Sequence, residues 1–329
     1  MKLIDRFFDI SNKKITKYGL CIAIFAIMAV LPIIPQIGND TLEVLWQAMF
    51  NVLLALGLNI IVGYCGMCDL GYAAKFAVGA YTTAILMNTF KWSFWLTLPA
   101  SVLVSALVAI IIGLPTLKLR SDYLAIVTLG FSEIVRITAR NLKITGSATG
   151  INFLKKPNFF GIQLVRSHWY FIFLVLVAIF IFISFRVRYS RFGRALTYIK
   201  EDEDAARAMG INTTLYKLYA YIIGAVLGGI AGSFYAIRMS SISPNSFDFT
   251  KSANILLAVI LGGIGKIPGV ILGALFLVIF PELFRELKIF EINVGDMRML
   301  FFGILLIIVM IFRPQGLWPD KFRKKRGNS

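Results

Sequence analysis

Long apolar runs separated by short polar segments extend along the chain. A membrane-spanning helix needs about 20 predominantly apolar residues, or about 17–25 with tilt. Ten stretches approach this length: Leu20–Ile34, Val44–Val62, Tyr72–Met87, Phe94–Leu114, Tyr123–Ile137, Trp169–Ile183, Tyr216–Ile237, Ala253–Leu261, Val270–Leu283 and Met299–Ile311. The third is interrupted by Gly79 and carries Lys75, and the fifth carries Glu133 and Arg136. The pattern predicts an all-α integral membrane protein with about ten transmembrane helices, some short or broken where they pack against protein.

No polar interruption is long enough for a separate soluble domain. The longest, Arg140–His168 and Arg186–Thr214, fall short of the ~100 residues or more of a nucleotide-binding core. We therefore expect one membrane domain over residues 1–329. An even number of spans puts both termini on the same side of the membrane. If that side is the cytoplasm, most of the 34 Lys and Arg residues also lie there, as the positive-inside rule for membrane proteins requires. The segments then expected in the cytoplasm are 1–17, 186–215 and 313–329.

Composition agrees with this pattern and excludes several classes of protein. Hydrophobic residues make up 58% of the 329 residues and charged residues 16%, whereas a soluble domain is ~45–50% apolar and ~25% charged. Three cysteines cannot staple a chain of this size, which excludes a disulfide-framed secreted module. The net charge is +17. Because the basic residues lie between apolar runs and form no recognised module, we expect no nucleic-acid partner.

The first span follows basic residues, as the apolar core of a signal peptide would. Lys13, Lys14 and Lys17 precede Leu20–Ile34, but no small-x-small cleavage site follows it. We therefore expect an uncleaved first span rather than a signal peptide.

Residues with catalytic or metal-binding potential are few. Cys65-Gly-Met-Cys68 has the spacing of a redox or half-zinc motif, but a structural zinc site needs four ligands. Cys21 is the one other cysteine and His168 the one histidine. We therefore interpret the pair as reduced cysteines at a membrane turn and expect no metal site. The lone histidine also leaves a membrane enzyme without an obvious base.

Two glycine-rich breaks lie in separate halves of the chain. Glycine lets the backbone turn sharply at membrane depth. Paired breaks point to an internal inverted repeat and a translocation route, although each break can also be a plain hairpin turn. The second break does not complete a phosphate-loop motif. The glycines are Gly63, Gly66 and Gly71 in the first break, with Gly79 beyond it, and Gly262, Gly263 and Gly265 in the second.

Three ionisable residues lie in or near apolar spans. Such groups are costly in hydrocarbon and usually face a cavity or a partner. Asp69 and Lys75 can pair if Asp69 lies at the mouth of a helix, and Glu133 lies farther along the chain. They either line a translocation route or only fix helix packing. With the glycines of the two breaks and Gly79, they are the candidate pathway residues.

The most informative polar segment is Arg191–Asn212. Glu201–Asp204 supplies acids, which the helix macrodipole favours at a helix start. Ala205 and Ala206 favour helix, and Gly210 ends it. We predict a short helix that stands between two spans and presents small side chains to a partner's cleft. Composition alone is also compatible with a solvated loop.

Five motifs follow one another between about residue 50 and residue 317. They are Leu58–Thr82, Leu119–Arg136, Ile199–Leu218, Ile260–Ala274 and Arg313–Leu317. Together they resemble the branched-chain amino acid ABC transporter permeases. The third motif resembles the family's cytoplasmic coupling loop, and the second resembles the LivM-type subunit in particular.

The resemblance implies a specific assembly in the bacterial inner membrane. This chain and a homologous LivH-type permease would form the lipid-embedded core, and two LivG/LivF-type ATPases would bind the coupling helices. An extracytoplasmic binding protein would deliver leucine, isoleucine, valine or a related small solute. The chain would be no enzyme and hold no cofactor, because the ATPases bind ATP and Mg. By resemblance, the ATPase-contacting residues are Glu201, Asp202, Glu203, Ala205, Ala206 and Gly210.

The chain departs from the family pattern near both breaks. Tyr72 and Lys75 stand where a histidine and an aromatic residue are common, and Lys266 stands in place of a serine. We hypothesise that the Asp69/Lys75 pair marks a solute other than a plain aliphatic amino acid. Transport assays on Lys75→Phe would test this, and unchanged solute choice would count against it.

Other functions remain compatible with parts of the pattern. A secondary transporter or channel would need no ATPase and hence no docking helix. A third possibility keeps the importer but changes the cargo to urea, a short amide or a nucleoside. Genes for an adjacent permease, ATPases and a binding protein would separate the importer from a secondary transporter, a channel or a membrane enzyme. The pocket of the binding protein would identify the cargo.

Overall fold

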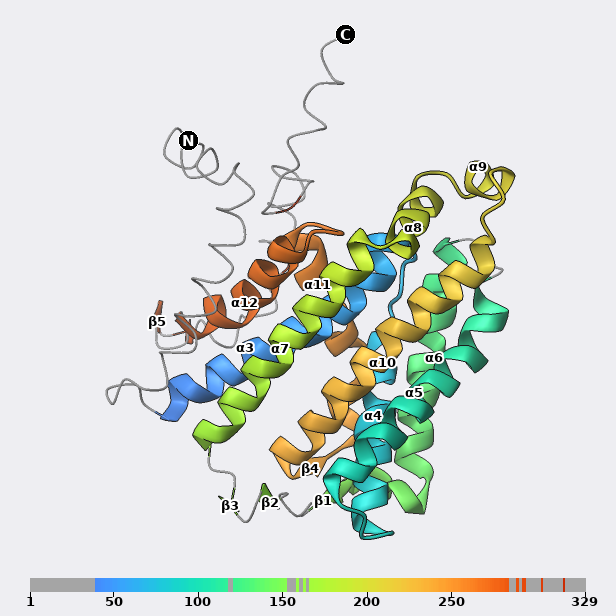
Figure 1. Ribbon diagram of the computed structural model, residues 1–329. Helices are drawn as coiled ribbons and strands as arrows, with labels where there is room; N and C mark the ends of the chain where they lie inside the picture. The colour runs from blue at the N-terminus through green and yellow to red at the C-terminus, as the bar shows by residue number, and fades with distance from the viewer. Residues whose placement is uncertain are drawn as a thin grey trace.

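The computed structural model describes residues 39–117, 121–152, 158–159, 162–163, 166–283, 288–289, 292–293, 303 and 316. Most of these residues lie in helices. Figure 1 shows a bundle of slanting helices with short strands at its margins. Apart from Gly303 and Gly316, four predicted segments lie outside the described residues: the spans Leu20–Ile34 and Met299–Ile311, the N-terminal segment 1–17 and the tail 313–329.

The described elements run in the following order. They are α3 (Asn39–Leu58), the π-helix η2 (Asn59–Tyr64), α4 (Tyr72–Asn88), α5 (Phe94–Thr116), α6 (Ser121–Asn141), η3 (Lys143–Thr145), η4 (Ser147–Thr149), β1 (Ile151–Asn152), β2 (Asn158–Phe159), β3 (Ile162–Gln163), α7 (Arg166–Tyr189), α8 (Arg191–Glu201), α9 (Glu203–Ala208), α10 (Thr213–Met239), β4 (Ser241–Ile242), η5 (Pro244–Phe247), α11 (Phe249–Gly262), α12 (Ile267–Leu283), β5 (Lys288–Ile289) and β6 (Ile292–Asn293). The strands pair antiparallel as β1 with β4, β2 with β3 and β5 with β6.

Four of the described helices are long and apolar enough to cross a bilayer. They are Thr41–Tyr64, Phe94–Thr116, His168–Tyr189 and Thr213–Met239. Each coincides with a predicted span. The remaining predicted spans in the described chain also form helices, but α4, α11 and α12 are shorter and α6 is more polar. The all-α class is therefore confirmed. Among the described helices, these four have the length and apolarity of a full membrane span.

The interruption predicted at Gly79 is wrong. Helix α4 runs without a break from Tyr72 to Asn88. Gly79 instead faces α10, where a Cβ atom added to it would lie 2.1 Å from the carbonyl oxygen of Gly229. Small residues let helices in a membrane approach closely. The glycine therefore serves the contact between α4 and α10, which the chain pattern alone did not distinguish from a helix break.

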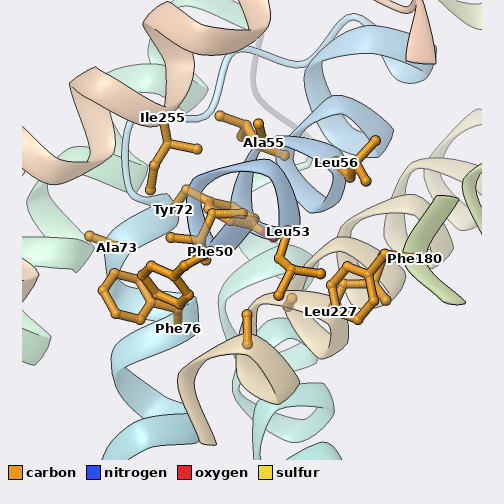
Figure 2. Close-up of a cluster of buried hydrophobic side chains, with 14 of the residues drawn as sticks. Phe50, Leu53, Ala55, Leu56, Tyr72, Ala73, Phe76, Phe180, Leu227 and Ile255 are labelled. Atoms are coloured by element: carbon orange, nitrogen blue, oxygen red, sulfur yellow. The ribbon is translucent and has the colours of Figure 1, made fainter. Parts of the chain in front are cut away.

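Helices α3 and α10 form the centre of the bundle. The most apolar part of Thr41–Tyr64 is 78% buried and that of Thr213–Met239 is 72% buried, against 33% for Phe94–Thr116 and 39% for His168–Tyr189. A helix that is apolar all round is a buried one, and the second half of α3, residues 52–58, fits this rule. Figure 2 shows its side chains among those of its neighbours: Phe50, Leu53 and Leu56 from α3, Phe76 from α4, Phe180 from α7, Leu227 from α10 and Ile255 from α11.

The two ends of the bundle carry different structures. Helices α8 and α9 lie at one end, and the β1–β4 pair lies at the other (Figure 1). Helix α10 connects them and has 27 residues, which at 1.5 Å per residue span about 40 Å. Anything near η5, which follows β4, is therefore far from α9.

Candidate functional site

The two glycine-rich breaks meet in the structure. Gly63 lies in η2, and Gly265 lies between α11 and α12. A Cβ atom added to Gly63 would lie 2.8 Å from the backbone nitrogen of Gly265. That same nitrogen donates to Oδ1 of Asn59 at 2.9 Å. The absence of side chains at both glycines thus permits backbone-to-backbone contact between the early and late halves of the chain.

Both predicted breaks are confirmed as interruptions of helix. Gly66 has φ 76° and follows η2, while Gly263 and Gly265 have φ 111° and 83° between α11 and α12. These values lie in a region that suits glycine. The other glycines of the breaks are in close contact, Gly262 with Gly269, Gly263 with Gly316 and Gly71 with Thr128.

Two basic side chains bind the carbonyl oxygens at these breaks. Nζ of Lys200 donates to the oxygen of Gly63 at 2.8 Å, and Nη1 of Arg188 donates to the oxygen of Gly265 at 2.8 Å. Gly63 lies in the last turn of η2, where the carbonyls lack partners within the helix and cations suit the negative end of its dipole. Lys200 lies in α8 and Arg188 at the end of α7. The predicted coupling segment is therefore bonded directly to the first break.

The electrostatic surroundings of Lys200 reflect this position. Burial lowers the pKa of Lys200, and the positive charges of Lys266 and Arg188 act in the same direction. A cavity of about 250 Å³ lies beside it, between the first break, α8, α9 and the start of α10. Cys65 and Met67 from the break and Glu203 from α9 are among its lining residues. The first break, α8 and α9 thus share one partly open space.

The coupling segment forms two helices where one was predicted. Asp202 has an extended backbone, and its side-chain Oδ1 accepts from the nitrogens of Asp204 and Ala205, both at 3.0 Å. It is the N-cap of α9, as an aspartate commonly is. The expected acidic helix start is therefore confirmed at Glu203 and Asp204. Its inclusion of Glu201 is wrong, because this residue ends α8.

Glu203 ties α9 to the bundle. Its carboxylate pairs with Lys217 in α10 and with Arg207 in α9. Burial raises the pKa of Glu203, but the hydrogen bond and charge of Lys217 outweigh it and hold the pKa below its ordinary value. Ala206 is 2% exposed and packs inward. These two residues therefore hold α9 in place, and they do not form its outer surface.

The outer surface of α9 mixes small apolar and charged side chains, because the side chains of Asp204 and Arg207 are 94% and 61% exposed. Ala205 and Ala208 are exposed, and Met209 is 79% exposed. Gly210 follows with φ 83° and ends the segment as predicted. Met209 was not among the predicted contact residues. An apolar side chain in an otherwise polar loop was the signal that could have identified it.

Asp69 and Lys75 form an ion pair, as the sequence suggested. Their side chains are 0% and 3% exposed. Asp69 also accepts from the nitrogen of Gly71 at 3.0 Å. Nζ of Lys75 lies 3.9 Å from the centre of the Tyr221 ring of α10, within the range of a cation–π contact. Within the described chain, the pair is enclosed between α4 and α10.

Glu133 lies apart from the breaks. It pairs with Arg136 one turn along α6, and Nε of Arg136 donates to its carboxylate at 2.9 and 3.1 Å. Both line an open pocket of about 350 Å³ with residues of η5 and α11. The candidate pathway residues therefore fall into separate places: the two breaks, the buried Asp69–Lys75 pair, the Gly79 helix crossing and the Glu133 pocket.

The cysteine pair forms no disulfide within the described residues. Cys65 is buried and Cys68 is partly exposed. Among the described residues, no group of three or more His, Cys, Asp or Glu side chains is placed to hold a metal ion. Cys21 lies outside them.

Comparison with known proteins places the chain in a family. Residues 41–310 match the family model described as "Branched-chain amino acid transport system / permease component". The match spans both breaks, α8 and α9. The chain belongs to this permease family. With its four long apolar helices, this permease is a multi-pass membrane protein.

Several curated relatives resemble the permease over most of its length. The LivM permease protein of the high-affinity branched-chain amino acid transport system of Salmonella typhimurium is 39% identical over 309 residues, covering 86% of this chain and 71% of the relative. A probable LivM permease of Methanocaldococcus jannaschii is 28% identical, covering 84% and 92%. The LivH permease protein of Escherichia coli is 26% identical, covering 82% and 94%. No solved structure matches the chain.

Proposed function

We propose that the chain is a membrane-spanning permease subunit of an ATP-driven ABC importer, and that it translocates leucine, isoleucine, valine or a related small solute. The names of the curated relatives support the transport role and the class of solute. The observation that carries the proposal is the hydrogen bond from Lys200 in α8 to Gly63 in the first break. It gives the coupling helices a direct contact with backbone inside the membrane domain.

In this proposal α9 docks into a cleft of an ATPase subunit. Its exposed face of Ala205, Ala208 and Met209 supplies small and apolar contact area. Glu203 and Ala206 hold the helix rigidly on the bundle. ATP-driven closure of the ATPases would displace α8 and α9 together, and Lys200 would pull on the Gly63 carbonyl. The permease would then rock between inward-open and outward-open states.

The assembly follows from this role. A homologous second permease of the LivH type, to which this chain is itself similar, would complete the membrane core. Two cytoplasmic ATPases would bind ATP and Mg, so that this chain hydrolyses nothing and holds no cofactor. An extracytoplasmic binding protein would deliver the solute. We place the single membrane domain, residues 1–329, in the bacterial inner membrane with both termini, the 186–215 loop and the basic tail in the cytoplasm.

The translocation route is proposed to involve the paired breaks. Glycine-interrupted helices at a repeat interface form the substrate route in many transporters. An internal inverted repeat would place Gly63 and Gly265 at equivalent positions, and their contact agrees with this. The pair Asp69–Lys75 is enclosed within the described chain, which favours a role in packing. Its proposed influence on solute choice is tested by uptake assays on Lys75→Phe.

Co-purification from the native membrane in mild detergent tests the proposed function. We expect a second permease and two ATPases to accompany the chain, and uptake by liposomes to require ATP and the binding protein. A chain that purifies alone and transports on an ion gradient without ATP would overturn the proposal in favour of a secondary transporter. Ligand screening of the captured binding protein would distinguish branched-chain amino acids from urea, short amides and nucleosides.

A further inference from the structure

An open pocket lies on α6 far from the coupling helices. Its volume is about 350 Å³, and its lining residues are Glu133, Arg136, Asn245, Asp248, Phe249 and Thr250. The last four come from η5, the start of α11 and the residue between them. Helix α10 has 27 residues and is about 40 Å long, and η5 follows its end opposite to α9. The η5 side of this pocket is therefore far from α9.

The pocket gathers both signs of charge. Glu133 and Arg136 pair one turn apart on α6, and their side chains are 40% and 21% exposed. Asp248 acts on Arg136 through its charge, while its Oδ1 accepts from the nitrogen of Lys251 at 2.9 Å as the cap of α11. Exposed charges in a membrane helix are costly unless they face water or a polar partner. This face of α6 is therefore unsuited to lipid.

The hydrogen-bonding groups leave capacity for a ligand. Arg136 uses Nε and Nη2 for Glu133. Within the described residues its Nη1 makes no hydrogen bond, and a guanidinium binds a carboxylate well through such a second nitrogen. Oδ2 of Asp248 likewise accepts no hydrogen bond within the described chain. An ammonium group suits the carboxylates of Glu133 and Asp248.

We propose that this pocket is a binding site for a zwitterionic amino acid, in which Arg136 holds the carboxylate and Glu133 with Asp248 holds the ammonium group. The amide of Asn245 and the hydroxyl of Thr250 add hydrogen-bonding groups. Phe249 supplies apolar surface for an aliphatic side chain. A volume of about 350 Å³ is at the small end of ligand pockets, as a single amino acid requires. The inference rests on the proposed importer function and assigns a solute site to this chain.

The site differs from the other charged pair of the chain. Asp69 and Lys75 are 0% and 3% exposed and lie against each other and the Tyr221 ring. They offer no open space to a solute. Glu133 and Arg136 are partly exposed, open to a pocket and accompanied by a second carboxylate. Recognition of a zwitterion needs both signs of charge in an accessible space, which the α6 pocket provides.

Reconstitution of the complete transporter in liposomes tests the proposal. The assembly comprises this chain, its partner permease, the ATPases and the binding protein, and the probe is tritiated leucine. Uptake and binding-protein-stimulated ATP hydrolysis are measured together. We expect Arg136→Gln to lower leucine uptake per ATP hydrolysed about tenfold or more, the effect of losing a charge-assisted hydrogen bond. The matched control is Arg140→Gln, one turn farther on α6 and exposed, which should leave the ratio unchanged.

A charge exchange separates solute binding from a structural ion pair. The double variant E133R/R136E keeps the pair on α6 but reverses it relative to the fixed Asp248. We expect uptake per ATP to remain low, whereas recovery to wild-type values would overturn the proposal. Should Arg136→Gln fail to assemble, Thr250→Val removes one hydroxyl at similar size and is expected to raise the half-saturating leucine concentration several-fold.

The outcomes separate this inference from the proposed function. Unchanged uptake per ATP in Arg136→Gln, or unchanged half-saturation in Thr250→Val, overturns the pocket while the importer stands. A wild-type assembly that takes up no leucine with ATP overturns the proposed function, and with it the assignment of this pocket. Low leucine uptake per ATP in both Arg136→Gln and the charge-exchanged variant, with wild-type uptake per ATP in Arg140→Gln, supports the pocket as an amino-acid site.

Discussion

Removing the positive member of the buried Asp69–Lys75 pair should strongly destabilise the bundle. The perturbation is Lys75→Met, which keeps the length and apolar stem of the side chain. Asp69 is fully buried, and its carboxylate is held by Lys75 and by the nitrogen of Gly71. The substitution would leave this carboxylate with one hydrogen bond and no counter-charge. It would also remove the contact of Lys75 with the Tyr221 ring.

The size of the effect follows from this geometry. Breaking a buried ion pair by removing one partner costs about 3–5 kcal/mol, whereas replacing both partners by well-packed apolar residues of similar volume is often neutral or stabilising. A loss of 1 kcal/mol lowers the melting midpoint of a large domain by about 2–4 °C. We therefore expect Lys75→Met to lower the midpoint by about 6–20 °C. The double variant Asp69→Asn/Lys75→Met should recover at least half of this loss.

Thermal unfolding of the purified chain in detergent measures both variants. The control is Lys143→Met, the same substitution at an exposed lysine of η3, which should shift the midpoint by less than about 2 °C. A double-mutant cycle then gives the interaction energy of the pair. A neutral Lys75→Met, or a double variant no more stable than the single one, would refute the argument that the buried carboxylate depends on its partner.

Three further predictions concern the helix crossing, the coupling contact and the docking face. Gly79→Ala should destabilise the chain by about 1–3 kcal/mol, because its Cβ atom would lie 2.1 Å from the backbone of α10. The control is Gly130→Ala on α6, where a Cβ atom would have no neighbour within 4 Å. It should be neutral or slightly stabilising in the same melting assay. Lys200→Met should leave the ATPases bound but lower uptake per ATP hydrolysed about tenfold or more, because it removes the hydrogen bond to Gly63. An unchanged uptake per ATP would show that this hydrogen bond does not couple ATP hydrolysis to transport. Met209→Asp should abolish ATPase co-purification, whereas Phe90→Asp should not. Phe90 is also exposed, but it lies in the loop between α4 and α5, at the end of the bundle opposite to α9 (Figure 1).

Local sequence patterns were sufficient to locate most of the described helices, but not all of their boundaries. The apolar runs predicted the four long helices, because a stretch of about 20 apolar residues is stable in a bilayer only with its backbone bonds satisfied internally. The acidic start at Glu203 and the end at Gly210 were also predicted, since capping and positive φ depend on neighbouring residues. The error at Glu201 has the same local origin: Asp202 was counted as part of one helix, but its side chain caps the next.

The candidate site depended on contacts that no local pattern contains. Lys200 and Gly63 are 137 residues apart, and Asn59 and Gly265 are 206 apart. Sequence did identify the two breaks, but not that they touch. Asn59 within the apolar span Val44–Val62 was a usable signal, because a polar residue at membrane depth usually has a partner.

The amino-acid sequence by itself determined that this protein is a helical membrane protein with two glycine-rich breaks and an acidic, alanine-containing helix between spans. These features follow from hydropathy, glycine conformation and capping, which act over a few residues. Only the tertiary structure decided that Gly79 serves a helix crossing, that Asp69 and Lys75 are enclosed, and that Lys200 of α8 bonds to the first break. Each of these depends on which helix faces agree in shape and charge when the bundle packs, and hydrophobic periodicity does not specify that choice.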